Sequence, residues 1–112
     1  MRTALSSGLI FLFATLVTPF AVAAERVEVC AEYESTGKKY RVMATIAKGS
    51  ELNRATKSYS YTGFSTYVVI FWSQENASII KMPFGPPSAF GSAGEDQEGR
   101  KWRVSTSTTF CF

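Results

Sequence analysis

The sequence predicts an all-β fold, a small antiparallel β-barrel or closed sandwich of about 5–7 strands. After residue 24 the chain has one leucine, Leu52, but many valine, isoleucine, threonine and aromatic residues, a composition that favours strands over helices. Several short segments alternate between apolar and polar residues, the pattern of a strand with one buried face. Two cysteines, Cys30 and Cys111, lie near opposite ends of this region, so one disulfide would link its first and last strands.

The first 24 residues have the composition of a cleavable secretory signal peptide. Arg2 precedes a short apolar run over residues 9–17, and the small residues at 21–24 suit cleavage after Ala23 or Ala24. The run is shorter than the roughly 20 residues that a bilayer span needs, so we expect no transmembrane span in the mature form. Residues 25–112 then form a single small β domain in the periplasm or outside the cell.

The positions of the two cysteines predict that the sheet is closed. In residues 27–34 one face carries Cys30 and the other is apolar, with Val27, Val29, Ala31 and Tyr33. A long strand over residues 100–112 puts Cys111 outside and turns inward Trp102, Val104 and Phe110. An oxidising compartment favours a Cys30–Cys111 disulfide. This bond requires the first and last strands to be neighbours with the same face outward, which closes the sheet.

Between these two strands we expect further strands and turns. Residues 35–38 predict a hairpin turn, and the following strand, residues 40–46, turns inward Tyr40, Val42, Ala44 and Ile46. Residues 51–57 are either one helical turn capped by Ser50 or a loop. Strands are expected over residues 58–62, 67–72 and 78–82, with a turn at 74–76. Residues 67–72 are apolar on both faces, which indicates a covered strand or a face that meets a partner.

The residue types exclude several kinds of catalysis. Because the chain has no histidine, it has no Ser–His or Cys–His nucleophile pair and no imidazole metal site. The densest carboxylates, Glu95, Asp96 and Glu98, predict a solvated turn rather than a calcium loop or a glycosidase pair. We therefore expect the protein not to be an enzyme and to bind no metal or cofactor. A hydrolase that uses these carboxylates alone is the third hypothesis, after the two binding and structural functions given below.

Segment 83–99 predicts a binding loop. Its three prolines and four glycines prevent a regular strand through most of it, and it presents Phe84 and Phe90. A loop stiffened by proline and carrying aromatic residues is preorganised for recognition. We expect Trp72 nearby and a basic rim of Lys38, Lys39, Arg100 and Lys101. Cross-strand pairing also accounts for these cations, since the outer face of the first strand carries Glu28, Glu32 and Glu34.

The expected function is an exported, non-catalytic β module that binds a protein or an envelope polymer through loop 83–99. In the competing interpretation, Phe84 and Phe90 fold back to cap the open end of the barrel. The alternative function is a structural or accessory subunit of an envelope assembly, an oligomer in which a partner covers the second apolar face of residues 67–72.

Charge and motifs give two further expectations. Without Arg2 the chain has 11 Lys and Arg residues against 9 Asp and Glu, and a net charge of about +2 is too small for a nucleic-acid partner. No motif identifies a family. The size, leader, disulfide and β content together resemble the architecture of small periplasmic lysozyme inhibitors.

Overall fold

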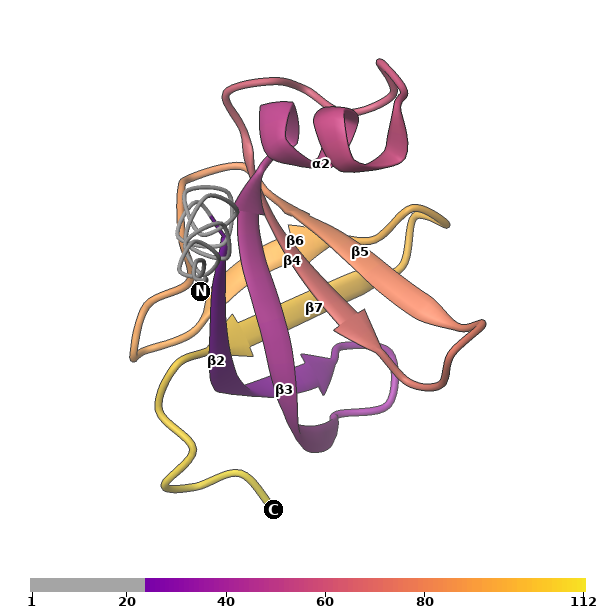
Figure 1. Ribbon diagram of the computed structural model, residues 1–112. Coiled ribbons are helices and arrows are strands. Elements are labelled where there is room, and N and C mark those ends of the chain that lie inside the picture. The colour runs from indigo at the N-terminus through magenta and orange to yellow at the C-terminus, as the bar shows by residue number, and fades with distance from the viewer. Residues whose placement is uncertain (1–23) are drawn as a thin grey trace, which may run out of the picture.

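In a computed structural model of the protein, which describes residues 24–112, six strands close into an antiparallel barrel (Figure 1). The strands are β2 (Glu25–Tyr33), β3 (Lys38–Lys48), β4 (Thr66–Phe71), β5 (Ala77–Met82), β6 (Ser92–Glu95) and β7 (Lys101–Ser105). They follow one another round the barrel in chain order, and β7 returns to pair with β2. The predicted closure of the sheet is therefore confirmed. Residues 1–23 of the predicted leader lie outside the described residues.

The hairpin of β2 and β3 forms as the alternation predicts. The turn over residues 34–37 ends at Gly37, whose φ of +74° lies in the left-handed region that glycine adopts without strain. Cα pairing runs from Glu25 with Ile46 to Tyr33 with Lys38. In this register the inward residues of one strand lie opposite the inward residues of the other. The inward side chains of this hairpin are buried or packed on the core, as predicted, and are Val27, Val29, Ala31, Tyr33, Tyr40, Val42, Ala44 and Ile46.

The core is built from small and medium apolar side chains that every strand except β6 contributes. Its buried members are Val29, Ala31, Ala44, Val68, Ile70, Ile80, Met82, Trp102 and Val104. On β6 the inward position is Gly94, where an added Cβ would lie 2.6 Å from Ile80 Cγ2 and 2.7 Å from Met82 Sδ. The absence of a side chain lets β6 approach β5 closely and lets these two side chains fill the space.

The connection between β3 and β4 contains the helix α2 (Gly49–Thr56), which lies over one end of the barrel (Figure 1). Its N-cap is Lys48, not Ser50 as expected, and the Lys48 N–H donates to Glu51 Oε1 at 2.8 Å. The strand predicted over residues 58–62 is wrong. The Asn53 amide accepts from Tyr61 N at 3.0 Å and donates to Tyr61 O at 2.9 Å, so it occupies the backbone groups that a neighbouring strand would use.

Strand β4 is covered on both faces, as its composition predicts. Val68 and Ile70 lie in the core, while on the outer face Tyr67 and Val69 are also buried. The Tyr61 ring packs edge-on against Tyr67, with centroids 5.3 Å apart. The chain itself therefore covers most of the second apolar face, and Phe71, 65% exposed, is what it leaves open to solvent.

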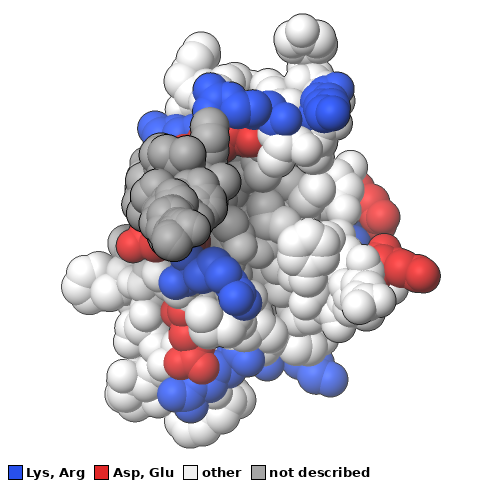
Figure 2. All heavy atoms as spheres, viewed as in Figure 1, with Lys and Arg blue, Asp and Glu red and all other residues white. Residues whose placement is uncertain are grey.

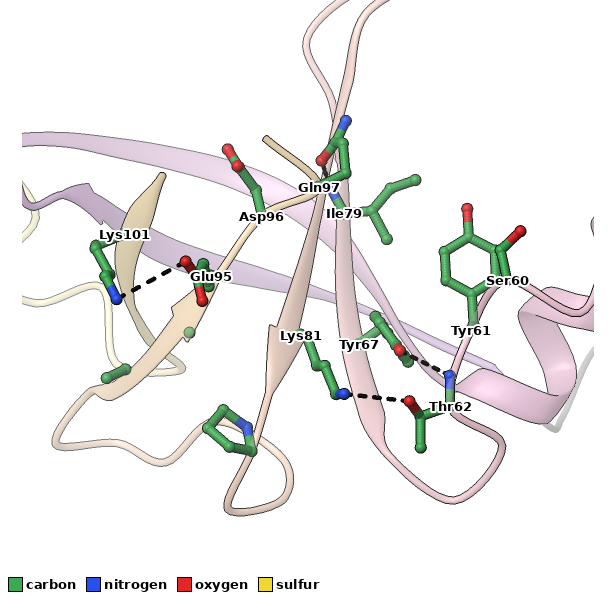
Figure 3. A pocket seen from close by; sticks show the side chains of 13 residues that line it. Ser60, Tyr61, Thr62, Tyr67, Ile79, Lys81, Glu95, Asp96, Gln97 and Lys101 are labelled. Atoms are coloured by element: carbon green, nitrogen blue, oxygen red, sulfur yellow. Dashed lines mark hydrogen bonds and ion pairs between the residues drawn. The ribbon is translucent and has the colours of Figure 1, made fainter. Parts of the chain in front are cut away.

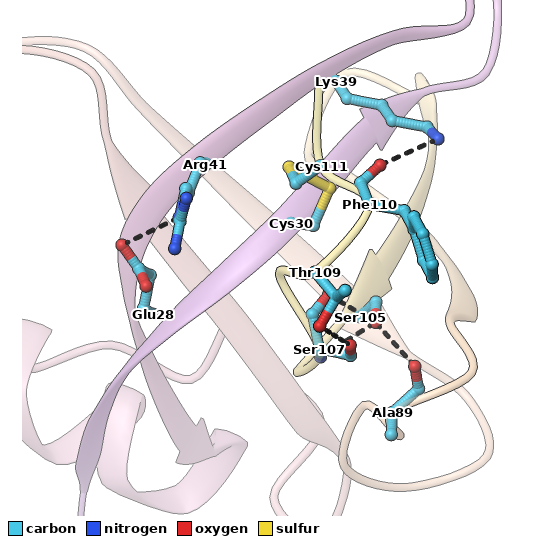
Figure 4. Close-up of a disulfide and its surroundings, with 10 residues drawn as sticks. All are labelled: Glu28, Cys30, Lys39, Arg41, Ala89, Ser105, Ser107, Thr109, Phe110 and Cys111. Atoms are coloured by element: carbon cyan, nitrogen blue, oxygen red, sulfur yellow. Dashed lines mark hydrogen bonds and ion pairs between the residues drawn. A yellow bond between two sulfur atoms is a disulfide. The ribbon is translucent and has the colours of Figure 1, made fainter.

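The long strand predicted over residues 100–112 is wrong beyond Ser105. The Ser105 hydroxyl accepts from Ser107 N and donates to Ala89 O, and the Thr106 N–H donates to Ser88 O at 3.0 Å. These bonds take the chain off the ladder, since serine and threonine side chains compete for backbone groups. The tail, residues 106–112, then reaches the outer side of β2, where Cys111 forms the predicted disulfide with Cys30 (Figure 4). Phe110 is consequently 72% exposed rather than in the core.

Candidate functional site

One end of the barrel carries three short turns, over residues 34–37, 72–76 and 96–100, and the other end carries α2 and the loop 83–91 (Figure 1). At the end with the short turns, the inward faces of β2, β3, β4 and β7 finish in aromatic residues. These are Tyr33, Tyr40, Trp72 and Trp102. We call this end the barrel mouth. It is open because the turns are too short to fold over it.

The aromatic rings of the barrel mouth contact one another. Trp72 and Trp102 are stacked, with centroids 5.9 Å apart and planes 23° apart. Tyr40 meets Trp72 edge-on at 5.2 Å, and Tyr33 lies 5.2 Å from Trp102. Trp102 is buried and forms the floor, whereas Trp72 is 38% exposed and presents part of its ring to solvent. Trp72 continues the inward face of Val68 and Ile70 and not the outer face of β4.

Hydrogen bonds fix both indoles. Trp72 Nε1 donates to Ser78 Oγ at 2.8 Å, and Trp102 Nε1 donates to Asp96 Oδ2 at 2.9 Å. A buried indole N–H needs such an acceptor, so each ring is held in one orientation. The rings are therefore a rigid surface on which a ligand could stack without an ordering cost.

Asp96 organises the turn beside the barrel mouth. Its carboxylate accepts from the N–H groups of Glu98 and Arg100, from Arg100 Nε and from Trp102 Nε1, each at 2.9 Å. Burial raises the pKa of Asp96, but these hydrogen bonds together outweigh burial and hold the pKa below its ordinary value. The prediction of a solvated turn is wrong for this residue, whose side chain is buried. The sequence offers one signal for this buried role. Asp96 is the one aspartate of the chain, and it stands shortly before Trp102.

The barrel mouth encloses a cavity of about 390 Å³ that has both apolar and polar walls. Beside the rings, its lining includes Asn76, Ser78, Glu98 and Arg100. Arg100 forms an ion pair with Glu98 at 3.2 Å, and the Lys38 ammonium lies 5.6 Å from the Tyr40 ring centroid. This arrangement suits a ring-shaped ligand that has an apolar face and a hydroxyl-bearing edge, because the indole contacts the face and the polar groups reach the edge.

A second cavity, of about 700 Å³, lies along the outer side of β5, and we call it the outer groove (Figure 3). Its walls are the loop residues 60–62 on one side and β6, Gln97 and Lys101 on the other. In the described part of the chain, the ladder between β5 and β6 is a single pair, Lys81 with Glu95. Beyond it, Gln97 Oε1 accepts from Ile79 N at 2.8 Å and Gln97 Nε2 donates to Ala77 O at 2.7 Å. Gln97 thus separates the outer groove from the barrel mouth.

The structure distributes the predicted site residues over several places. Trp72 and Arg100 lie at the barrel mouth with Lys38 beside them, and Lys101 lies in the outer groove. Lys39 and Phe110, both drawn in Figure 4, line a smaller cleft of about 220 Å³ next to the disulfide. Phe90 lines the same cleft. The predicted rim is therefore not one surface.

The predicted loop 83–99 is not one loop either. It contains β6, so residues 83–91 lie at the end of the barrel with α2, and residues 96–99 lie at the barrel mouth. Phe84 and Phe90 are 93% and 92% exposed and do not fold back to cap the barrel. Trp72 is accordingly close to the 96–100 turn but at the opposite end of the barrel from residues 83–91.

Within residues 24–112, cross-strand pairing accounts for Lys101 of the predicted basic rim but not for its other members, and it also pairs Arg41 with the first strand. Arg41 Nε lies 3.4 Å from Glu28 Oε2, and Lys101 Nζ lies 3.8 Å from Glu95 Oε2. On the face seen in Figure 2, cations gather over α2 and again at the bottom, with acidic side chains between and beside them. This face does not present a surface of a single sign.

Comparison of the chain with protein-family models, with curated proteins and with solved structures finds no match. The resemblance to small periplasmic lysozyme inhibitors therefore rests on architecture alone.

Proposed function

We propose that the protein is an exported, non-catalytic binding module that recognises a glycan of the cell envelope at the barrel mouth. One observation carries the proposal: both tryptophans of the chain converge with Tyr33 and Tyr40 at one open end of the barrel, and each indole is held by a hydrogen bond. Rigid aromatic rings at an open surface contribute most to recognition, because they bury a large area at little cost in entropy.

The chemistry of the barrel mouth favours a sugar ring over the other flat ligands. A pyranose has C–H groups on one face, which pack on an indole, and hydroxyl groups round its edge, which can bind Asn76 and Glu98. Arg100, the cation that lines the cavity, is already paired with Glu98 and Asp96, so it is not free to bind the phosphates of a nucleotide. The cavity volume of about 390 Å³ lies within the range of small-ligand sites.

Two features support export. The first 24 residues have the pattern of a secretory leader, and the Cys30–Cys111 disulfide is compatible with an oxidising location. Among the described residues, no helix has the length and apolar character to cross a membrane. A periplasmic or secreted module would meet envelope polymers directly.

Co-sedimentation with insoluble envelope polysaccharide tests the proposal. We expect isolated peptidoglycan or polysaccharide-bearing outer-membrane fragments to retain the protein, and Trp72→Ala to weaken retention at least about fivefold, since stacking on one aromatic ring contributes about 1–3 kcal/mol. Phe71→Ala is the matched control, because Phe71, the last residue of β4, is the aromatic residue next to Trp72 and faces outward. Retention by none of these polymers, or equal retention of both variants, would overturn the proposal.

A second candidate, a protein partner, is favoured by the exposure of Phe84 and Phe90. Exposed aromatic side chains on loops are common anchors of protein interfaces. Phe90 lies on a segment fixed by backbone contacts between Ser88 and residues 105–106. A pull-down that compares the wild type with Phe84→Ala/Phe90→Ala tests this candidate, since a genuine interface would lose its partner. Unchanged partners would remove residues 83–91 from consideration.

A further inference from the structure

Two polar groups of the outer groove meet at Thr62 (Figure 3). Lys81 Nζ donates to Thr62 Oγ1 at 3.1 Å, and Tyr67 Oη accepts from Thr62 N at 2.9 Å. The loop 57–65 is held in place by the amide of Asn53, so this meeting point is anchored to α2 and to the barrel. The Lys81 ammonium and the Tyr67 hydroxyl are therefore neighbours on the floor and wall of one groove.

The Tyr67 hydroxyl and the Lys81 ammonium can each donate a further hydrogen bond to a ligand. Tyr67 is 5% exposed, and within residues 24–112 its hydroxyl hydrogen has no acceptor. Over the same residues Lys81 has no ion pair, whereas Lys101 on the opposite wall is occupied by Glu95. A buried hydroxyl without an acceptor is costly, and an ammonium next to it attracts negative charge. The two together are suited to an anionic oxygen, which can accept from both.

The outer groove also adjoins the barrel mouth. Strand β5 begins at the mouth with Ala77 and Ser78 and continues into the groove with Ile79 and Lys81. The three to four residues between these points span about 10–13 Å at the rise of a β-strand. The side chain of Gln97 lies between the two sites. It binds Ala77 of β5 on the side of the barrel mouth and Ile79 of β5 on the side of the outer groove. An extended ligand could therefore occupy both sites, and a single sugar could not.

We propose that the outer groove binds a carboxylate or phosphate group of the same polymer whose sugar ring stacks at the barrel mouth, so that the ligand is an acidic oligosaccharide. This inference rests on the proposed function of the barrel mouth. It assigns the anion to Lys81 and Tyr67, and it assigns the neutral part of the ligand to Trp72 and its neighbours.

Calorimetric titration of the full chain with three probes tests the inference. The probes are a neutral gluco-oligosaccharide, an oligouronate of the same length, and the gluco-oligosaccharide carrying phosphate esters. We expect the wild type to bind at least one acidic probe about tenfold more tightly than the neutral one, and the preferred probe identifies carboxylate or phosphate as the anion. Lys81→Gln should remove this preference, Lys81→Arg should keep most of it, and Tyr67→Phe should reduce it.

Arg26→Gln is the matched control, because it removes one exposed positive charge from β2, which is not a neighbour of β5. Equal losses in Lys81→Gln and Arg26→Gln would mean that overall charge, not the outer groove, sets the preference, and would overturn the inference. Binding of all three probes with the same affinity, weakened by Trp72→Ala alone, would overturn it and leave the proposed function intact. Binding of no probe, together with no retention on envelope polysaccharide, would overturn both.

Discussion

The side-chain oxygen of Gln97 accepts the Ile79 N–H at 2.8 Å, a bond that elsewhere in the barrel is made by the backbone of a neighbouring strand. Strand β6 ends at Glu95, and its ladder with β5 is a single pair. The carboxamide of Gln97 offers both an acceptor and donors, as a backbone does, and its Nε2 donates to Ala77 O as well. One side chain thus completes the closure of the barrel and forms the ridge between the barrel mouth and the outer groove.

Removal of the Gln97 side-chain amide should weaken the contact between β5 and the end of β6. In Gln97→Ala, the Ile79 N–H loses its acceptor, so we expect its hydrogen exchange to accelerate about tenfold and stability to fall by about 1–2 kcal/mol. Exchange measured by NMR at Ile79, compared with Ile80, checks this. Gln74→Ala, in the exposed turn after β4, is the control and should leave both amides protected. Unchanged protection of Ile79 would show that the bond contributes nothing to closure.

Asp96 should be essential for the order of the barrel mouth. Asp96→Asn keeps the size of the side chain but withdraws a charged acceptor from Arg100 and Trp102, so we expect a loss of about 2–3 kcal/mol in the free energy of unfolding. Chemical denaturation monitored by tryptophan fluorescence measures it. Glu98→Gln, which removes an exposed partner of Arg100, should cost less than about 1 kcal/mol. Equal effects of the two substitutions would contradict the role given to Asp96.

The same carboxylate should make stability depend on pH in acid. Burial raises the pKa of Asp96, yet hydrogen bonds from Trp102, Arg100 and Glu98 lower it further than burial raises it, and the net pKa lies below the ordinary 3.8. The unfolded chain therefore binds the proton first, so this contribution is complete above the unfolded pKa and is lost as the pH falls through the folded value. Denaturation from about pH 6 to about pH 2 should show a steeper loss below about pH 4 in the wild type than in Asp96→Asn. Parallel curves would contradict this.

Gly94 should tolerate no side chain. In Gly94→Ala the new Cβ would meet Ile80 and Met82 at under 3 Å, and we expect a loss of about 2 kcal/mol because a packed core yields only with strain. Thermal or chemical denaturation measures the loss. In the control Gly63→Ala the added Cβ meets nothing within 4 Å, so stability should change by less than about 0.5 kcal/mol. If Gly94→Ala is as stable as the wild type, β6 is not as close to β5 as described.

The disulfide should stabilise the fold without being needed for pairing of β2 with β7. The cysteines are 81 residues apart, and closing a loop of that length contributes about 4.5 kcal/mol in the chain-entropy account. We expect Cys30→Ser/Cys111→Ser to lose up to that amount while keeping the β spectrum, because the ladder of Cys30 with Ser105 does not involve sulfur. Thiol labelling of the unfolded, unreduced wild type should find no free thiol. Two reactive thiols per chain would contradict the bond.

Much of the barrel could be predicted because its strands alternate cleanly. Val29, Ala31, Tyr40 and Val104 point inward as their positions require, and the two cysteines near the ends indicate closure. The prediction of closure contains one wrong premise, since Cys111 reaches Cys30 from an irregular tail and not from a strand. Either route requires the tail to start beside β2, so the sheet is closed in both cases.

The errors arise where side chains replace the backbone as hydrogen-bonding partners. Asn53 takes the backbone of Tyr61, and Ser105 takes that of Ser107 and Ala89, so two alternating segments are not strands. The side chains of Gln97 and Asp96 likewise accept backbone N–H groups, those of Ile79 and Arg100. Alternation describes only which face a residue would have if a strand formed, and it carries no information on a distant amide or hydroxyl that competes for that strand's bonds.

The most direct test of the barrel mouth as the binding site is an NMR titration of its two indoles. Trp72 and Trp102 are the chain's two tryptophans, and their N–H groups donate to different acceptors, so they should give separate signals. With increasing concentration of the oligosaccharide that binds most tightly, we expect the Trp72 signal to shift and saturate, with smaller changes at Trp102 and none at Phe84 or Phe90. Saturable shifts at Phe84 and Phe90, with both indole signals unmoved, would contradict the account.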